Sequence, residues 1–210
     1  NFKAGGAAIN QLCELADLKL DVIPLDLEHP TNDLSLGPAM TENEVIAAMN
    51  IGADALDAEC DYLIVGEMGI GNTTSAAALC LGRFGADAAD WAGPGTGLDD
   101  KGVKHKAKVI KAALANQGPI AQNAVALLAA VGGRELAAIA GAVLAARVRS
   151  IPVMLDGYTS TAAASALTAN GHLAALDHTM ISHMSAEPGH RQLAVALGKQ
   201  PLVDLQMRLG

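Results

Sequence analysis

One segment of the chain combines glycines with polar residues in an order that can bind an anion. Residues Gly66–Thr74 read G-E-M-G-I-G-N-T-T and follow the apolar run Tyr62–Val65. An Ala- and Leu-rich stretch with helical periodicity comes next, so the segment should join a strand to the start of a helix. Unpaired N–H groups and the helix dipole attract phosphate at such a start. We therefore predict a phosphate site, with a tight turn that binds no ligand as the alternative.

Two common phosphate-binding motifs do not fit this segment. A P-loop needs Lys where the chain has Asn72, and a dinucleotide-binding loop needs a third glycine where it has Thr74. Glu67, in contrast, directly follows the strand, and ligands of parallel sheets bind beyond the carboxyl ends of strands. We interpret Glu67 as a substrate-site carboxylate, with helix capping or ion pairing as the alternative.

A second glycine loop, Gly93–Asp100, precedes a helical stretch that carries Lys106. The glycines at 95 and 97 allow a backbone to approach a phosphate closely, and a lysine can supply the opposing charge. The adjacent Asp99 and Asp100 could suggest magnesium, but acidic pairs at a helix start more often complement the helix dipole. The loop is a second candidate phosphate contact, and an ordinary surface loop is the alternative.

Two further segments follow expected strands, and the first of them has an acid, a glycine and hydroxyl groups. These segments are Leu155–Thr161 and His183–His190. The chain's six histidines lack the spacing of a metal site. We predict no metal and give His183 and His190 little functional weight.

Short β-rich runs alternate with longer stretches of 3.6-residue periodicity along the chain. The expected strands are Asp21–Leu27, Tyr62–Gly66, Ile151–Asp156 and His178–His183. The expected helices are Gly5–Leu18, Thr41–Glu59, Thr73–Leu81, Gly102–Asn116, Gly118–Val131, Arg134–Val148, Thr159–Asn170 and Pro188–Gly198, with a capping box at Thr41–Glu44. This alternation predicts an α/β fold, a doubly wound, mostly parallel, Rossmann-like sheet with helices on both faces, in a single domain over residues 1–210.

Composition excludes several kinds of partner. The net charge of −8 disfavours nucleic acid, because such binding depends on Lys and Arg. The longest apolar stretch, Leu136–Ala146, is too short to cross a membrane. The three cysteines are odd in number and have no CxxC spacing, which argues against a disulfide framework or zinc site and favours a cytoplasmic location.

Taken together, these segments resemble the nicotinate-nucleotide–dimethylbenzimidazole phosphoribosyltransferase family, and the match runs through the whole chain in order. The most specific string is Glu67–Thr74. The other matching residues are Asn1-Phe2 with Gly5–Asn10, Gly95–Leu98 followed by Lys106, Leu155–Gly157, Ser185–Glu187 with Gly189, and Met207–Gly210.

The resemblance implies a homodimeric enzyme that acts on small molecules. It exchanges the nicotinate of nicotinate mononucleotide for 5,6-dimethylbenzimidazole, giving α-ribazole 5′-phosphate, and needs no cofactor. Glu67 would stabilise charge or orient the sugar. The residues that the resemblance places around the substrate are Gly69, Gly71, Asn72, Thr73, Thr74, Gly95, Thr96, Gly97, Lys106, Asp156, Gly157 and Ser185.

The resemblance also places functional segments outside this sequence. The family's general-base glutamate would follow Gly210, and a segment preceding Asn1 would help to form the benzimidazole pocket. We therefore expect a central portion of the family's chain, with weak turnover by these 210 residues. Two alternatives stay open, namely a nucleotide-binding or assembly module without catalysis, and a magnesium-dependent transferase that uses pyrophosphorylated ribose.

Overall fold

A computed structural model of the chain describes residues 2–115, 117 and 123–205. The chain divides into two compact units, residues 1–30 and residues 31–210. We call them the N-terminal unit and the main unit and describe each by itself. The expectation of a single domain stays a prediction.

The N-terminal unit contains a 3-10 helix, Phe2–Ala4, and helix α1, Ala8–Leu15. The helix predicted at Gly5–Leu18 is therefore confirmed over Ala8–Leu15. The strand predicted at Asp21–Leu27 is wrong, because these residues form no strand. Pro24 has no N–H for a sheet ladder, and Asp26 has a positive φ of 51°, which is incompatible with an extended strand.

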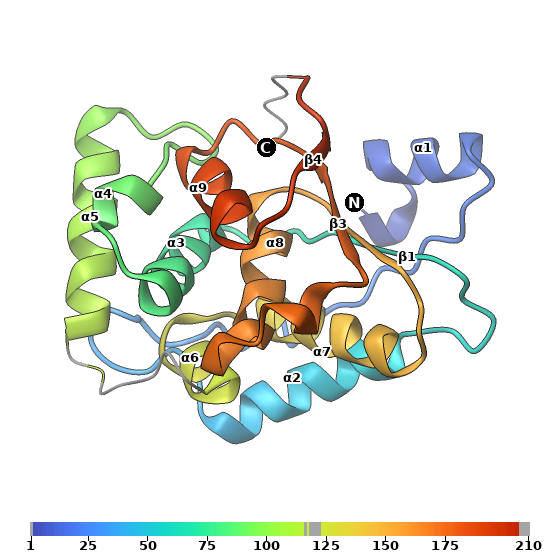
Figure 1. Ribbon diagram of the computed structural model, residues 1–210, viewed down its shortest axis with the longest axis horizontal. Helices are drawn as coiled ribbons and strands as arrows, with labels where there is room; N and C mark the ends of the chain where they lie inside the picture. The colour runs from blue at the N-terminus through green and yellow to red at the C-terminus, as the bar shows by residue number, and fades with distance from the viewer. Residues whose placement is uncertain (1, 116, 118–122, 206–210) are drawn as a thin grey trace. The chain divides into compact units, whose positions relative to one another are not determined.

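The main unit is built on a four-stranded parallel sheet in the order β1-β2-β3-β4 (Figure 1). Its strands are β1 (Leu63–Val65), β2 (Val153–Leu155), β3 (Thr179–His183) and β4 (Pro201–Val203). The first three confirm predicted strands. The protein therefore has the α/β, Rossmann-like architecture that the sequence predicts.

Alternate residues of the strands point to opposite faces of the sheet. Val65, Val153 and Leu155 are buried and belong to the same hydrophobic core as the alanine-rich helices. Ile64 and Met180 point the other way and are 51% and 37% exposed. The packed core thus lies against one face of the sheet in the described part of the chain.

Helices connect the strands and form most of the main unit (Figure 1). They are α2 (Glu42–Asp54), α3 (Asn72–Phe84), α4 (Ala88–Trp91), α5 (Asp100–Ala115), α6 (Ala124–Val131), α7 (Arg134–Val148), α8 (Tyr158–Ser165) and α9 (Pro188–Ala196), with 3-10 segments at Ala166–Gly171 and Leu173–Leu176. Every predicted helix of this unit is confirmed at least in part, whereas the short α4 and strand β4 were not predicted.

Two of the predicted helices do not match the described structure over their full length. The predicted helix Thr159–Asn170 leaves the α-helical form after Ser165, where the Ser165 and Thr168 hydroxyls donate to backbone carbonyls three residues earlier. Such bonds compete with regular helix bonding. Residues 118–122 of the helix predicted at Gly118–Val131, and the matching string Met207–Gly210, lie outside the described residues.

Helices α2 and α7 pack at a distance that only glycine permits. A Cβ atom at Gly52 would lie 1.8 Å from the Ala138 carbonyl oxygen, and one at Gly141 would lie 1.9 Å from the Met49 carbonyl oxygen. The backbones therefore approach each other without intervening side chains. This packing holds α2 against the middle of α7.

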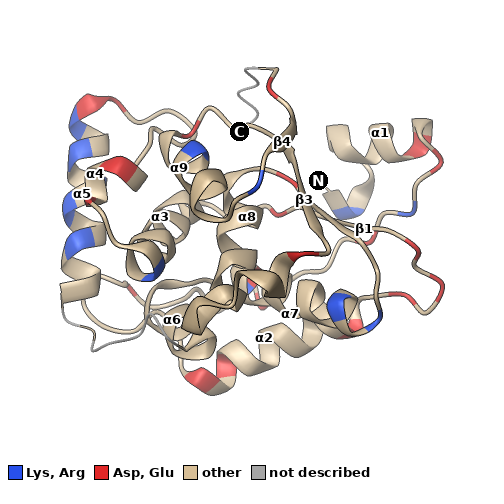
Figure 2. Cartoon of the chain, in the orientation of Figure 1, with Lys and Arg blue, Asp and Glu red and all other residues tan. Residues whose placement is uncertain are grey.

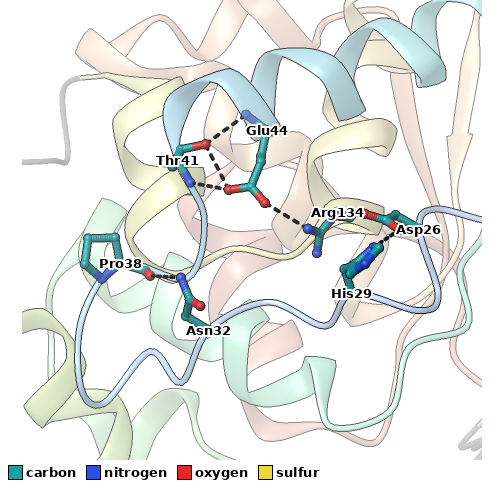
Figure 3. A network of polar contacts seen from close by, with 7 residues as sticks. All are labelled: Asp26, His29, Asn32, Pro38, Thr41, Glu44 and Arg134. Carbon is teal, nitrogen blue, oxygen red and sulfur yellow. Dashed lines mark hydrogen bonds and ion pairs between the residues drawn. The ribbon is translucent and has the colours of Figure 1, made fainter.

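Polar contacts hold the start of α2 (Figure 3). The predicted capping box is confirmed, because Thr41 Oγ1 accepts from the Glu44 N–H at 3.2 Å and Glu44 Oε2 accepts from the Thr41 N–H at 2.8 Å. Arg134, the first residue of α7, pairs with Glu44 at 2.9 Å. The Asn32 side chain donates to the Pro38 carbonyl at 3.3 Å in the preceding loop. These bonds anchor both helices at one end.

Candidate functional site

The loop from β1 to α3 has the backbone shape predicted for an anion site. Gly71 precedes the first residue of α3 and has a φ of 78°, a left-handed conformation that favours glycine. Helix α3 then begins at Asn72, a residue that is 9% exposed and whose side-chain amide donates to the Glu67 carboxylate. Gly69 lies under this amide, because a Cβ there would be 2.6 Å from Asn72 Nδ2. The loop therefore places Glu67 beside the N-terminus of α3.

Glu67 lies in a partly buried, acidic environment. Burial raises the pKa of its carboxyl group, and the nearby Glu135 and Asp156 raise it further. Hydrogen bonds from Asn72 and Thr159 act in the opposite direction. The net result is a raised pKa, so Glu67 holds a proton more tightly than a carboxylate in water.

Lys106 is the basic residue that the fold turns inward. It is 5% exposed, whereas the neighbouring lysines of α5, at 101, 104, 108 and 111, are exposed. Figure 2 shows the basic residues of α5 as blue segments along the helix. Its Nζ donates to Thr73 Oγ1 at 2.8 Å and to the Gly93 carbonyl at 3.1 Å. Burial lowers the Lys106 pKa, and the Glu187 carboxylate raises it. A buried ammonium group thus lies between the two predicted glycine loops.

The second glycine loop meets the first at Thr73. Gly95 has a φ of 54°, and a Cβ there would be 3.0 Å from Thr73 Oγ1 and 3.9 Å from Lys106 Nζ. The structure therefore brings Thr73, Gly95 and Lys106 together, as the resemblance implies. Thr96 and Gly97 follow on the exposed outer part of this loop.

A buried histidine connects the loops that follow β2 and β3. His190 Nδ1 accepts the Ser185 N–H at 2.9 Å, and Nε2 lies 3.3 Å from Thr161 Oγ1. The Thr161 hydroxyl donates to the Gly157 carbonyl at 2.9 Å. With Nδ1 as acceptor, the neutral ring carries its proton on Nε2. Burial, followed by the charge of His183, lowers the His190 pKa to about 4.

Asp156 lies on the exposed side of these loops. Its Oδ1 is 3.6 Å from His183 Nδ1, and its Oδ2 would be 3.7 Å from a Cβ at Gly66. Asp156 also raises the pKa of Glu67 through its charge. The predicted residues of the β1 and β2 loops are therefore close enough to act on one another.

Sequence reasoning missed Glu135 and Glu187. A Cβ at Gly69 would lie 2.9 Å from Glu135 Oε1, so the start of α7 reaches the β1 loop. Glu187 Oε1 accepts the Gly95 N–H at 2.8 Å. Glu187 belonged to a matching string, but its partner lies 92 residues away, and no local pattern indicates that contact.

A shallow hollow of about 320 Å³ opens beside the β3–α9 loop. It is lined by Met184, Ser185, Ala186, Glu187, Pro188, Arg191 and Asp204. Across the described residues, no group of three or more His, Cys, Asp or Glu side chains is arranged to hold a metal ion. No helix in the described part of the chain is long and apolar enough to span a bilayer.

Comparisons with known proteins agree with one another. A family described as phosphoribosyltransferase matches residues 1–210. The nicotinate-nucleotide–dimethylbenzimidazole phosphoribosyltransferases of Ruegeria sp. (strain TM1040) and Rhodobacter capsulatus are 53% and 52% identical to this chain; each match covers 100% of the chain and 62% of the relative. The crystal structure of CobT from Thermus thermophilus matches 100% of this chain and 68% of its own, with a TM-score of 0.86 and 36% identity. The chain thus spans less than two thirds of the length of these curated relatives.

Proposed function

Since this chain belongs to the nicotinate-nucleotide–dimethylbenzimidazole phosphoribosyltransferase family, we propose that it carries the phosphoribosyl-binding site of such an enzyme. The reaction would transfer ribose phosphate from nicotinate mononucleotide to 5,6-dimethylbenzimidazole. The products would be α-ribazole 5′-phosphate and nicotinate. No cofactor takes part in this proposal.

The observation that best supports the proposal is the meeting of Thr73, Gly95 and Lys106. Thr73 lies in the first turn of α3, where free N–H groups and the helix dipole favour an anion. The Lys106 ammonium group is bonded to the Thr73 hydroxyl, so a positive charge is held at the same point. This arrangement suits the 5′-phosphate of a nucleotide. The backbones of Gly69, Gly71, Thr74, Thr96 and Gly97 would shape the surrounding loops.

Cleavage of the bond between ribose and nicotinate does not need a general acid. The ring nitrogen of nicotinate carries a positive charge in the mononucleotide and leaves as a neutral pyridine. Positive charge then develops on the ribose, and a fixed carboxylate stabilises it. Glu67 fits this role in its ionised form, and Asn72 holds its carboxylate in place. By the family resemblance, the base that deprotonates the incoming benzimidazole would be a glutamate after Gly210.

The remaining predicted residues would contact the sugar side of the nucleotide. Asp156 and Gly157 follow β2, and Ser185 follows β3, so all lie at the carboxyl edge of the sheet, where ligands of parallel sheets bind. The hydrogen bonds through His190 keep Gly157 and Ser185 at a fixed separation. We assign these three residues to binding of the ribose.

The proposal includes a homodimer that works in the cytoplasm. The three cysteines, Cys13, Cys60 and Cys80, are all free thiols, which is in keeping with a reducing compartment. The homodimer is inferred from the family resemblance. Light scattering during size-exclusion chromatography would test it, and a monomeric mass at micromolar concentration would contradict it.

A nicotinate-release assay tests the proposed activity. Purified protein is mixed with nicotinate mononucleotide and 5,6-dimethylbenzimidazole, and nicotinate and α-ribazole phosphate are quantified by chromatography. Weak formation of both products, reduced further in a Lys106→Ala variant, is the expected result for these 210 residues. Thermal stabilisation by nicotinate mononucleotide without any product would indicate the non-catalytic nucleotide-binding module instead. No stabilisation at millimolar ligand would contradict both.

A further inference from the structure

Glu187 joins two loops that the sequence does not connect. It precedes α9, and its Oε1 accepts the Gly95 N–H at 2.8 Å. Its own N–H donates to Ser185 Oγ at 3.2 Å. The carboxylate therefore ties the glycine loop before α5 to the loop between β3 and α9.

The glycine loop is shaped to receive this carboxylate. A Cβ at Gly93 would lie 2.1 Å from Glu187 Oε2 and 2.8 Å from Pro188 Cδ, so only glycine leaves room there. The Gly93 carbonyl in turn accepts from Lys106 Nζ at 3.1 Å. Glu187, Gly93 and Lys106 are thus in continuous contact.

Glu187 also sets the charge balance around Lys106. Burial favours the neutral amine of Lys106, and the Glu187 carboxylate opposes that effect. The two groups that accept hydrogen bonds from Lys106 Nζ, the Thr73 hydroxyl and the Gly93 carbonyl, are neutral. Among the described residues, Glu187 is therefore the charge that acts on this ammonium group.

One oxygen of the Glu187 carboxylate destabilises the fold. Its second oxygen, Oε2, is buried and has no hydrogen-bond partner among the described residues. A buried polar atom without a partner destabilises the fold and calls for an explanation. Orientation of the phosphate-binding groups provides one, because Oε1 and the charge act directly on Gly95 and Lys106.

We propose that Glu187 is a positioning residue of the phosphate site, holding the Gly93–Gly97 loop and the Lys106 ammonium group in their binding arrangement without touching the substrate. This inference rests on the proposed function and deepens it. It differs from a purely structural role, since removal of the charge should weaken ligand binding in a protein that still folds and should shift the alkaline loss of binding to lower pH. The negative charge also keeps Lys106 protonated to higher pH.

The test compares Glu187→Gln with the wild type by calorimetric titration of nicotinate mononucleotide and by thermal unfolding. The glutamine side chain of this variant can still accept the Gly95 N–H but carries no charge. We expect the Kd to rise roughly 3- to 10-fold, as for one weakened hydrogen-bonded contact. Thermal unfolding checks that the variant is folded in the titrations. In titrations from pH 7 to pH 10, the variant should lose its binding of nicotinate mononucleotide at a lower pH than the wild type does. Glu59→Gln, at an exposed position before β1, is the matched control and should change neither quantity.

The outcomes distinguish failure of the inference about Glu187 from failure of the proposed function. If the wild type binds nicotinate mononucleotide and Lys106→Ala weakens that binding, an unchanged Kd in Glu187→Gln overturns the inference alone. Tighter binding by Glu187→Gln would also overturn it, because the charge would then oppose the phosphate. The variant could both bind more weakly and unfold at a lower temperature. The pH at which half of the ligand binding is lost then decides, and a value equal to that of the wild type assigns Glu187 a structural role only. Failure of the wild type to bind overturns the proposed function and the inference with it.

Discussion

The Lys106 ammonium nitrogen lies 2.8 Å from the Thr73 hydroxyl oxygen, although the two residues are 33 positions apart in the chain. Thr73 belongs to the helix that follows the first strand, and Lys106 belongs to α5. Their contact brings a buried positive charge to a helix N-terminus, where an anion is already favoured. Each prediction below depends on this site or on the packing that supports it.

Replacement of Lys106 by alanine should weaken the binding of nicotinate mononucleotide. A hydrogen bond to a charged group contributes about 1.5–3 kcal/mol, so the Kd should rise on the order of 10- to 100-fold. Isothermal titration calorimetry measures the change. Lys104→Ala is the matched control, because Lys104 lies on the exposed face of the same helix. Equal affinities for the two variants would contradict the assignment of Lys106.

Replacement of Glu67 by glutamine should stabilise the ligand-free protein at neutral pH. The folded-state pKa of Glu67 is raised, so its contribution to stability is present below the unfolded pKa of about 4.3 and is lost as pH rises through the folded pKa. The variant should therefore unfold at a higher temperature than the wild type at pH 7. The difference should vanish near pH 4. A Glu67→Gln protein that is less stable at pH 7 would disprove this account.

His190 should remain neutral well below the usual pH of histidine titration. Its pKa is lowered to about 4, so its contribution to stability is present above pH 6.5 and is lost as pH falls toward 4. An NMR titration of the His190 ring measures this directly. A His190 midpoint at pH 6 or above would show that its ring is not held as described.

An alanine at Gly141 should destabilise the main unit. Its Cβ would lie 1.9 Å from the Met49 carbonyl oxygen, a backbone atom that cannot move without shifting α2. Overpacking of this kind costs about 1–3 kcal/mol, which a urea titration resolves. Gly37→Ala is the matched control, because a Cβ there meets nothing within 4 Å. Equal stability of the two variants would contradict the close packing of α2 and α7.

Local patterns predicted most of the fold. The helical periodicity of Arg134–Val148 and the apolar runs before Glu67 and Asp156 are properties of short segments, and the structure confirms them. Strand β4, Pro201–Val203, escaped detection because it begins with a proline, which argues against a strand in a sequence pattern. The strand expected at Asp21–Leu27 failed because its apolar residues surround a proline and a left-handed aspartate.

The candidate site could be predicted only in part. Glu67 and Lys106 were found because glycine loops adjoin them in the sequence, and the resemblance carried their assignment. Glu135 and Glu187 act on residues more than 60 positions away, on Glu67 and Gly95. Such contacts depend on how α7 and α9 pack. No local pattern in a single sequence indicates that packing.

The central claim is that nicotinate mononucleotide places its phosphate beside Lys106. A crystal structure of the protein with this ligand measures the position of the phosphate directly. We expect its oxygens within hydrogen-bonding distance of Lys106 Nζ and of backbone N–H groups in residues 69–74 or 95–97. A phosphate bound elsewhere, with Lys106 still bonded only to Thr73 and Gly93, would contradict the account.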